Sequence, residues 1–213
     1  MVLDRLGEQI SLRVAFGIIM TMNKVVFIVP GFSELTSEEK YQKIARYFKK
    51  TNITPIIVDI NWKRKVMSEY VQEFLTKYEQ KKSEINYFWG FSFGAVICFI
   101  ASSKVEVDTQ ILCSLSPFFS EDIPMIRPAW LKYWGKKRTG DFKKIHSEDL
   151  VKTIKAKTIL LTGSKEGKEI TATKNRIYQL LICKKEQYII KNAKHDISNP
   201  DYQKKVEKII LSL

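Results

Sequence analysis

Cysteine and histidine are scarce in this chain of 213 residues, which has three cysteines and two histidines. The cysteine count is odd, and Cys98 and Cys113 fall in apolar runs. We therefore expect small core residues in a reducing, cytoplasmic compartment rather than a disulfide framework. No pair of cysteines has the spacing of metal ligands, so we expect no metal site.

Acidic residues are also few, at 23 against 36 lysines and arginines, which gives a formal net charge of +13. Such an excess suits an anionic partner such as nucleic acid, an acidic carrier protein or a lipid surface. The lysines are spread along most of the predicted helices and turns, which favours a solvated basic surface instead. No zinc-finger spacing and no RNP-like aromatic motif is present, so we expect no nucleic-acid partner.

A long apolar run is missing as well. The mostly apolar stretch at residues 12–22 is too short to span a membrane before Asn23 and Lys24 interrupt it. Asp4 and Glu8 weaken any resemblance to a signal peptide, and no small-residue cleavage site follows. We expect residues 1–23 to be an extension outside the core, or a short helix on its surface, and residues 24–213 to form one domain.

Short apolar runs rich in β-formers alternate with helical patterns, and no repeat or low-complexity linker interrupts them. The predicted strands cover residues 25–29, 56–60, 85–89, 111–115, 158–162 and 187–190. Two helix starts are predicted, a capping box of Thr36 and Glu39 and an N-cap at Asn199 before Pro200. A helix is also expected over residues 175–182. The alternation predicts an α/β fold, with a mostly parallel six-stranded sheet and helices on both faces.

The motif Gly90-Phe91-Ser92-Phe93-Gly94 lies between the third predicted strand and an apolar helical run at residues 95–101. A G-x-S-x-G sequence between strand and helix is typical of a nucleophile elbow, in which a strained turn projects the serine hydroxyl. The flanking glycines avoid collisions with the neighbouring strand and helix. The alternative is a glycine-rich turn in which Ser92 caps the helix.

A nucleophilic serine needs a base to accept its proton. His195 follows the last predicted strand, at the edge where parallel sheets place their active sites. His146 lies in a lysine-rich helical segment, which makes His195 the better candidate.

The base in turn needs a carboxylate that orients it. Glu166 follows the fifth predicted strand, and the order serine, acid, histidine along the chain is the one that a nucleophile elbow predicts. Glu121 and Asp122, after the fourth predicted strand, are the alternative acids, and a solvated charge at Glu166 remains the alternative to a functional one.

The interval at residues 117–153 is longer than one crossover needs. Its aromatic residues include Phe118, Phe119, Trp130, Tyr133 and Trp134, and prolines stand at 124 and 128. It is either a small cap over a site or an ordinary helix whose aromatic side chains enter the core.

From residue 24 onward the chain resembles the α/β-hydrolase superfamily, in a small version without the first two strands. The resemblance rests on the motif at residues 90–94, the turn at 163–166 and the late Lys194-His195-Asp196. It implies that the backbone N–H groups of Phe32 and Phe93 form an oxyanion hole. Two positions depart from the family: proline at 30, where histidine is common, and glutamate at 166, where aspartate is commoner.

The resemblance implies a serine hydrolase that cleaves a small-molecule carboxylic ester or thioester through an acyl-enzyme on Ser92. Such a reaction requires no metal or organic cofactor. The basic surface would suit a substrate on an acidic carrier protein. Because the superfamily includes binding proteins without activity, a catalytically silent interaction protein is the alternative.

Overall fold

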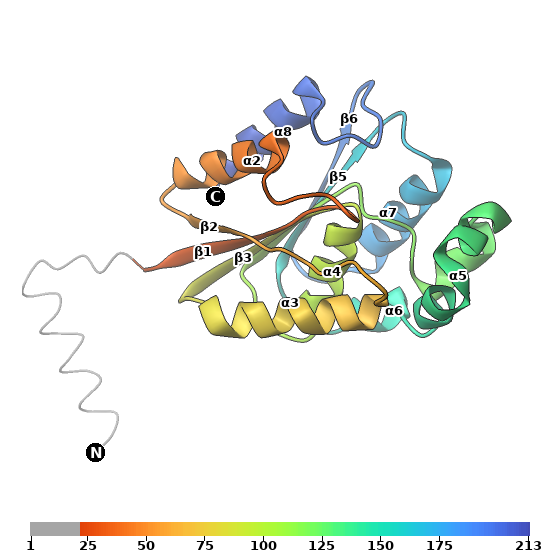
Figure 1. Cartoon of the computed structure of the whole chain (residues 1–213). Coiled ribbons are helices and arrows are strands. Elements are labelled where there is room, and N and C mark those ends of the chain that lie inside the picture. Colours follow the sequence, from red (N-terminus) through yellow and green to blue (C-terminus); the bar gives the residue numbers. More distant parts are fainter. Residues whose placement is uncertain (1–21) are drawn as a thin grey trace, which may run out of the picture.

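Residues 22–213 are described by the computed structural model, so the expected extension at residues 1–23 lies almost wholly outside the described part of the chain. Within that part, one all-parallel sheet has the strand order β2-β1-β3-β4-β5-β6 (Figure 1). The strands are β1 (Lys24–Val29), β2 (Thr54–Ile57), β3 (Ile85–Phe91), β4 (Thr109–Cys113), β5 (Lys157–Gly163) and β6 (Lys185–Ile190). The predicted fold class is confirmed.

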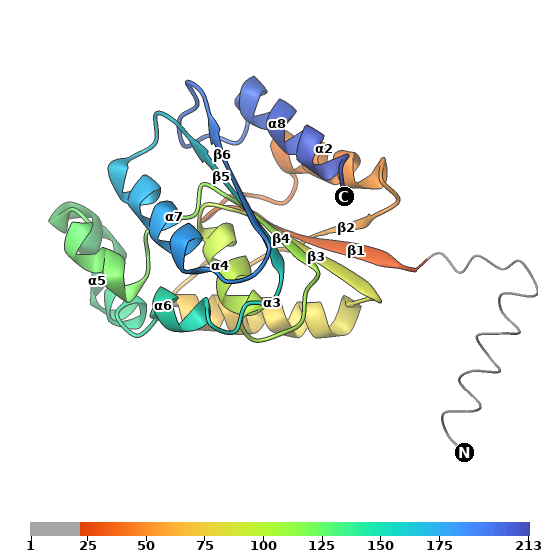
Figure 2. The same cartoon turned by 180° about the vertical axis from the view of Figure 1, so that it is seen from behind.

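Helices cover both faces of this sheet (Figures 1 and 2). One face is covered by α2 (Glu39–Lys49) and α8 (Pro200–Ile210), the other by α3 (Met67–Lys81), α4 (Phe93–Ser102) and α7 (Lys168–Leu180). Side chains alternate between the two layers along β1: Val26 and Ile28 enter the first, Phe27 and Val29 the second. A continuous apolar run is what a strand buried on both faces requires.

The interval at residues 117–153 contains the 3-10 helix η1 (Ser120–Met125), α5 (Pro128–Phe142) and the short α6 (Ser147–Leu150). In both views α5 lies at the end of the molecule opposite the start of β1. It bends at Gly135, whose φ of 76° glycine adopts without a steric penalty. Trp134 and Phe142 are buried, whereas Trp130 and Tyr133 are exposed, so α5 both packs on the core and presents aromatic rings to solvent.

Two strand predictions are displaced from the observed strands. The predicted strand at 56–60 ends at Ile57, because Val58 and Ile60 are buried in the following loop rather than in the sheet. The predicted strand at 111–115 ends at Cys113, because Ser114 adopts a φ of 52°, which is incompatible with a strand. An apolar pattern in the sequence indicates which residues are buried. It does not distinguish a buried loop residue from a residue in a strand.

Of the two predicted helix starts, one is confirmed and the other is wrong. Asn199 caps α8, its side chain accepting hydrogen bonds from the N–H groups of Asp201 and Tyr202, as predicted. The predicted capping box of Thr36 and Glu39 is wrong: α2 begins at Glu39 without a side-chain cap. The helix predicted over residues 175–182 overlaps α7, which begins earlier, at residue 168, and ends at residue 180, two residues before the predicted end.

The strand order places a switch point between β1 and β3. From β1 the chain passes outward to β2, returns to β3 on the other side of β1, and then continues in one direction to β6. In open α/β sheets, ligands bind at the carboxyl ends of the strands where this direction reverses. The turn after β1 and the motif after β3 both lie at this position.

Cys98 and Cys113 are buried, and Cys183 is partly buried; all three are free thiols. Burial raises the pKa values of the Cys98 and Cys113 thiols well above their usual range, as expected for inert core residues. Within residues 22–213, no group of histidine, cysteine and acidic side chains is arranged to hold a metal ion. No helix of the same range has the length and apolar character needed to cross a membrane.

Candidate functional site

Ser92 occupies a strained turn between β3 and α4, with φ 55° and ψ −117°. The two glycines of the motif make this turn possible. A Cβ on Gly90 would lie 2.5 Å from the carbonyl oxygen of Gly94, and one on Gly94 would collide with the backbone carbonyls that end β1. The Ser92 hydroxyl makes no capping hydrogen bond to α4, so it is free to point toward other groups.

His195 lies on the loop after β6 and contacts Ser92. Its Nε2 is 2.9 Å from Ser92 Oγ, and its ring packs on Phe91 with the centroids 5.0 Å apart. The other histidine, His146, has Nδ1 4.0 Å from an oxygen of Glu121 and lies at the start of α6. The structure therefore brings His195, and not His146, to the serine.

Glu166 completes this group from the loop after β5. Its Oε2 is 3.0 Å from His195 Nδ1, and its side chain is fully buried. The other oxygen, Oε1, accepts hydrogen bonds from the Ser114 hydroxyl at 2.7 Å and the Gly163 N–H at 2.6 Å. With Oε1 occupied in this way, Oε2 is held toward the imidazole.

A buried tyrosine extends this network to the last helix. The Tyr202 hydroxyl, on α8, lies 2.8 Å from Ser114 Oγ. Burial raises the pKa of Tyr202 well above its usual range, so its hydroxyl remains a donor. Ser114 donates to Glu166, so Tyr202 supplies the hydrogen between the two hydroxyls and shares it with the Leu161 carbonyl at 3.2 Å. The φ of Ser114 is positive, at 52°.

The direction of each hydrogen bond at Ser92 follows from donor and acceptor identities. The Glu166 carboxylate only accepts, so in a neutral His195 ring Nδ1 carries the single hydrogen and Nε2 accepts from the Ser92 hydroxyl. The buried Ser116 hydroxyl, on the loop after β4, lies 3.0 Å from Ser92 Oγ. Because the Ser92 hydrogen points to His195, Ser116 must be the donor in this contact.

The alternative acids, Glu121 and Asp122, belong to η1 and bond to groups other than His195. Asp122 is fully buried and forms a 2.7 Å ion pair with Arg176 of α7. It also accepts from the Thr173 hydroxyl at 2.7 Å. Glu121 accepts weakly from the backbone N–H of Ser147 at 3.3 Å. Within residues 22–213 neither carboxylate bonds to His195.

Hydrogen bonds to nearby side chains, which no sequence motif predicts, hold the turn after β1 in place. The Gly31 N–H donates to Glu34 Oε2 and to the Tyr41 hydroxyl, each at 2.9 Å. Tyr41 in turn donates to Glu34, since burial and the neighbouring carboxylate raise the pKa of its hydroxyl. Lys40 holds the second oxygen of Glu34 at 2.6 Å. This network supports the turn that begins with Pro30.

Phe32 and Phe93, the residues predicted to supply the oxyanion donors, pack against each other at the switch point. The rings of Phe32 and Phe93 have centroids 5.3 Å apart. Within the described part of the chain, neither backbone N–H donates a hydrogen bond to another backbone group. Phe93 is the first residue of α4, where the N–H groups carry the positive end of the helix dipole.

Aromatic rings surround these two phenylalanines. Trp134 of α5 stacks on Phe93 with a centroid distance of 4.7 Å and lies 4.8 Å from Phe32. Phe118 is 4.8 Å from Phe93, and the Arg138 guanidinium lies 5.4 Å above the Phe32 ring. The side chain of Phe93, the residue after Ser92, therefore lies among aromatic rings.

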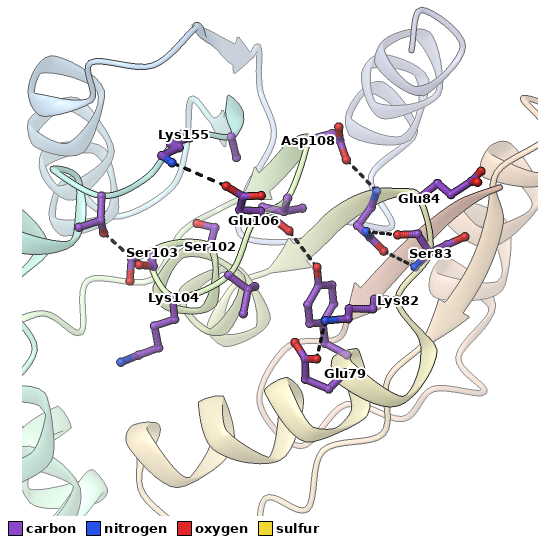
Figure 3. Close-up of a pocket in the computed structure, with 16 residues that line it drawn as sticks. Glu79, Lys82, Ser83, Glu84, Ser102, Ser103, Lys104, Glu106, Asp108 and Lys155 are labelled. Atoms are coloured by element: carbon purple, nitrogen blue, oxygen red, sulfur yellow. Dashed lines mark hydrogen bonds and ion pairs between the residues drawn. The ribbon is translucent and has the colours of Figure 1, made fainter. Parts of the chain in front are cut away.

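A groove of about 790 Å³ lies at the opposite edge of the sheet, between the loops that precede β3, β4 and β5 (Figure 3). Its polar groups bond to one another: the Tyr78 hydroxyl to the carbonyl of Glu106 at 2.8 Å, and the Asn86 amide to the carbonyl of Ser83 at 2.7 Å. None of the predicted site residues lines it. The groove and the Ser92 group are separate features of the fold.

No protein-family model matches this sequence, and no curated protein sequence matches it. Solved structures match over nearly the whole chain. Est1E from Butyrivibrio proteoclasticus has a TM-score of 0.76 at 13% identity, covering 90% of this chain and 88% of that one. The esterase domain of a Rhodothermus marinus protein has a TM-score of 0.69 at 14% identity, covering 91% and 88%.

Mouse alpha/beta hydrolase domain-containing protein 10 has a TM-score of 0.70 at 11% identity, with 88% of each chain covered. At these identities the likeness concerns the fold. The parallel sheet, its strand order and these structural matches show that the chain has the fold of the α/β-hydrolase superfamily.

Proposed function

We propose that this chain is a serine hydrolase that cleaves a carboxylic ester or thioester through an acyl-enzyme on Ser92. The observation that carries the proposal is the position of His195, 2.9 Å from Ser92 Oγ and 3.0 Å from the Glu166 carboxylate. A serine is activated as a nucleophile when a base and an orienting carboxylate are in hydrogen-bond contact with it, one after the other. One of the similar structures is an esterase domain by name, which agrees with acyl chemistry.

In the first half of the proposed reaction, Ser92 Oγ attacks the carbonyl carbon while its proton passes to His195 Nε2. The carbonyl π electrons move to oxygen, and the N–H groups of Phe32 and Phe93 stabilise the resulting oxyanion. Glu166 stabilises the imidazolium and keeps its ring in one orientation.

Collapse of the tetrahedral intermediate breaks the bond to the alcohol or thiol, which leaves with the proton of His195. A water molecule then attacks the acyl-enzyme and gives a proton to His195, and the second collapse releases the acid. The proton on His195 returns to Ser92 Oγ. Substrate, water and these side chains supply every proton and electron pair of the cycle.

The aromatic surroundings favour an apolar acyl group over a sugar. Phe93 directly follows Ser92 in the chain, and Phe32, Phe118 and Trp134 pack around its ring, so this side of the site offers apolar groups rather than hydrogen-bonding ones. Burial of apolar substrate surface against such rings is favourable in proportion to the area removed from water. A series of activated esters and thioesters with graded acyl length would define the preference.

A fluorophosphonate probe tests the proposal directly. The probe is expected to label the folded protein at Ser92, as identified by peptide mass spectrometry, and to leave Ser92→Ala unlabelled. Circular dichroism of both proteins controls for folding. If the folded wild-type protein were not labelled, the chain would instead be a catalytically silent interaction protein.

Ser116→Ala is expected to slow turnover about tenfold, because the nucleophile loses one hydrogen-bond donor of ordinary strength. The loss should fall on kcat and on the rate of fluorophosphonate labelling rather than on KM, since Ser116 contacts Ser92 and not the acyl group. Ser120→Ala, at the start of η1 just after this loop, is a matched control and should keep the wild-type rate. Equal rates in all three proteins would show that the contact has no part in the reaction.

A further inference from the structure

Cations dominate the exposed residues of α5 and its flanks. Exposed basic residues there are Arg127, Lys132, Lys136, Lys137, Lys143 and Lys144. Between residues 123 and 147 the one acidic residue is Asp141, and it accepts two hydrogen bonds from Ser68. Of these exposed cations, Lys137 alone has an ion pair within residues 22–213, at 3.5 Å from Glu69. This surface therefore carries positive charge that its own surroundings do not neutralise.

Large apolar side chains are exposed on the same stretch. Tyr133 is 67% exposed, Trp130 52% and Met125 40%. Trp130 and Tyr133 are the two aromatic members of the exposed large hydrophobic residues described. Single exposed apolar residues are ordinary, but several together among cations indicate an interaction surface. We call the exposed set of Met125, Arg127, Trp130, Lys132, Tyr133 and Lys136 the α5 surface.

Aromatic contacts connect the α5 surface to the nucleophile. Trp130 and Tyr133 have centroids 6.0 Å apart, and Tyr133 is 5.2 Å from the buried Trp134. Trp134 stacks on Phe93 at 4.7 Å, and Phe93 directly follows Ser92 in the chain. A row of rings thus leads from the exposed part of α5 to Phe93, the residue after Ser92.

We propose that the α5 surface docks on an anionic lipid bilayer, and that the ester cleaved at Ser92 belongs to a lipid in that bilayer. Tryptophan and tyrosine, with apolar rings and polar tips, suit the headgroup region of a membrane. Lysines beside them are attracted to anionic headgroups. The docking stands on the α5 surface alone, whereas the lipid substrate rests on the function proposed above.

An acidic protein partner fits this surface less well. Protein interfaces are enriched in arginine, whose planar guanidinium binds carboxylates in fixed geometry, and are depleted in lysine. The exposed cations on and beside α5 are five lysines and one arginine. A lysine ammonium on a flexible stem suits a fluid layer of headgroups rather than a fixed set of carboxylates.

Vesicle co-sedimentation with the Ser92→Ala protein measures docking without turnover. Binding is expected to vesicles of mixed phosphatidylglycerol and phosphatidylcholine, to weaken in high salt, and to be far weaker to pure phosphatidylcholine. K132E/K136E should reduce binding at least about tenfold, and W130A/Y133A should also reduce it. The matched control is K204E/K208E on the exposed side of α8, which changes net charge equally and should retain binding.

Equal loss in the α5 and α8 double variants would overturn the proposal, because it would show attraction by net charge alone. Binding to an acidic acyl-carrier protein that K132E/K136E abolishes, without binding to anionic vesicles, would replace the lipid with a protein partner. Hydrolysis of soluble p-nitrophenyl acetate by the otherwise wild-type K132E/K136E protein should be unchanged.

Hydrolysis of an ester lipid in anionic vesicles should fall in K132E/K136E as binding falls. If vesicle binding is intact but neither ester is cleaved by the wild-type protein, the proposed hydrolase function fails and the docking stands. If p-nitrophenyl acetate is cleaved but the vesicle lipid is not, the lipid-substrate half of the proposal is wrong.

Discussion

Replacing His195 with alanine is expected to lower kcat roughly a millionfold, the size of loss seen when the base of a serine triad is removed. The physical reason is that the Ser92 proton then has no basic acceptor. The remaining neighbour of Ser92 Oγ, the Ser116 hydroxyl, is itself a donor to it. His195 lies on a loop with a partly exposed ring, so the melting temperature should change little. Steady-state kinetics and thermal unfolding measure the two effects.

His146→Ala is the matched control, since it removes the other histidine of the chain. Its side chain is exposed and its nearest charged partner is Glu121, at 4.0 Å. This variant should keep wild-type kcat and KM. Inactivity of His146→Ala together with full activity of His195→Ala would reverse the assignment of the base.

Glu166→Gln is expected to lower kcat about ten-thousandfold and to leave the fold intact. The amide oxygen of the glutamine would take the place of Oε1, because that position accepts from Ser114 and Gly163. The amide NH₂ would then face His195 Nδ1 and donate to it. Nε2 would carry the ring hydrogen in that tautomer and could no longer accept the proton of Ser92. Kinetics on protein shown to be folded by circular dichroism test this.

Glu121→Gln should retain most activity, because Glu121 contacts the backbone at the start of α6 and not His195. Asp122→Asn should also turn over normally per folded molecule, but with a lower melting temperature. Its carboxylate is buried in an ion pair with Arg176, and breaking such a pair leaves an uncompensated charge. Full activity of Glu166→Gln with loss of activity in Glu121→Gln would move the acid to the loop after β4.

The strands buried on both faces were predictable because burial requires a continuous apolar run. Residues 25–29 and 158–162 are such runs, and β1 and β5 contain them. For the edge strand β2, the apolar pattern predicts residues 56–60 instead of 54–57, because Val58 and Ile60 are buried without being in the sheet. Strand order could not be predicted from these runs, since it depends on which distant segments pair.

Ser92, Glu166 and His195 could be selected because each follows a recognisable strand and one lies in a glycine motif. Ser116 and Ser114 could not, because a serine without such a motif carries no pattern. Their contacts depend on distances across the fold: Ser114 and Tyr202 are 88 positions apart. The sequence offers only a weaker indication for Ser114, namely that a polar residue directly follows the buried strand β4. Glu34 could not be predicted either, since no motif marks it and its partner is the backbone of the turn after β1.

The bond between Ser92 and His195 joins residues 103 positions apart, and Tyr202 connects the same network to α8. This separation has a consequence for folding kinetics. The entropy of closing so long a loop must be overcome before the contact forms, so the contact belongs to the late steps of folding. In a refolding experiment, fluorophosphonate labelling should therefore return after the circular dichroism signal of the sheet. Until β6 and α8 dock, a partly folded chain contains Ser92 as an ordinary, unreactive alcohol.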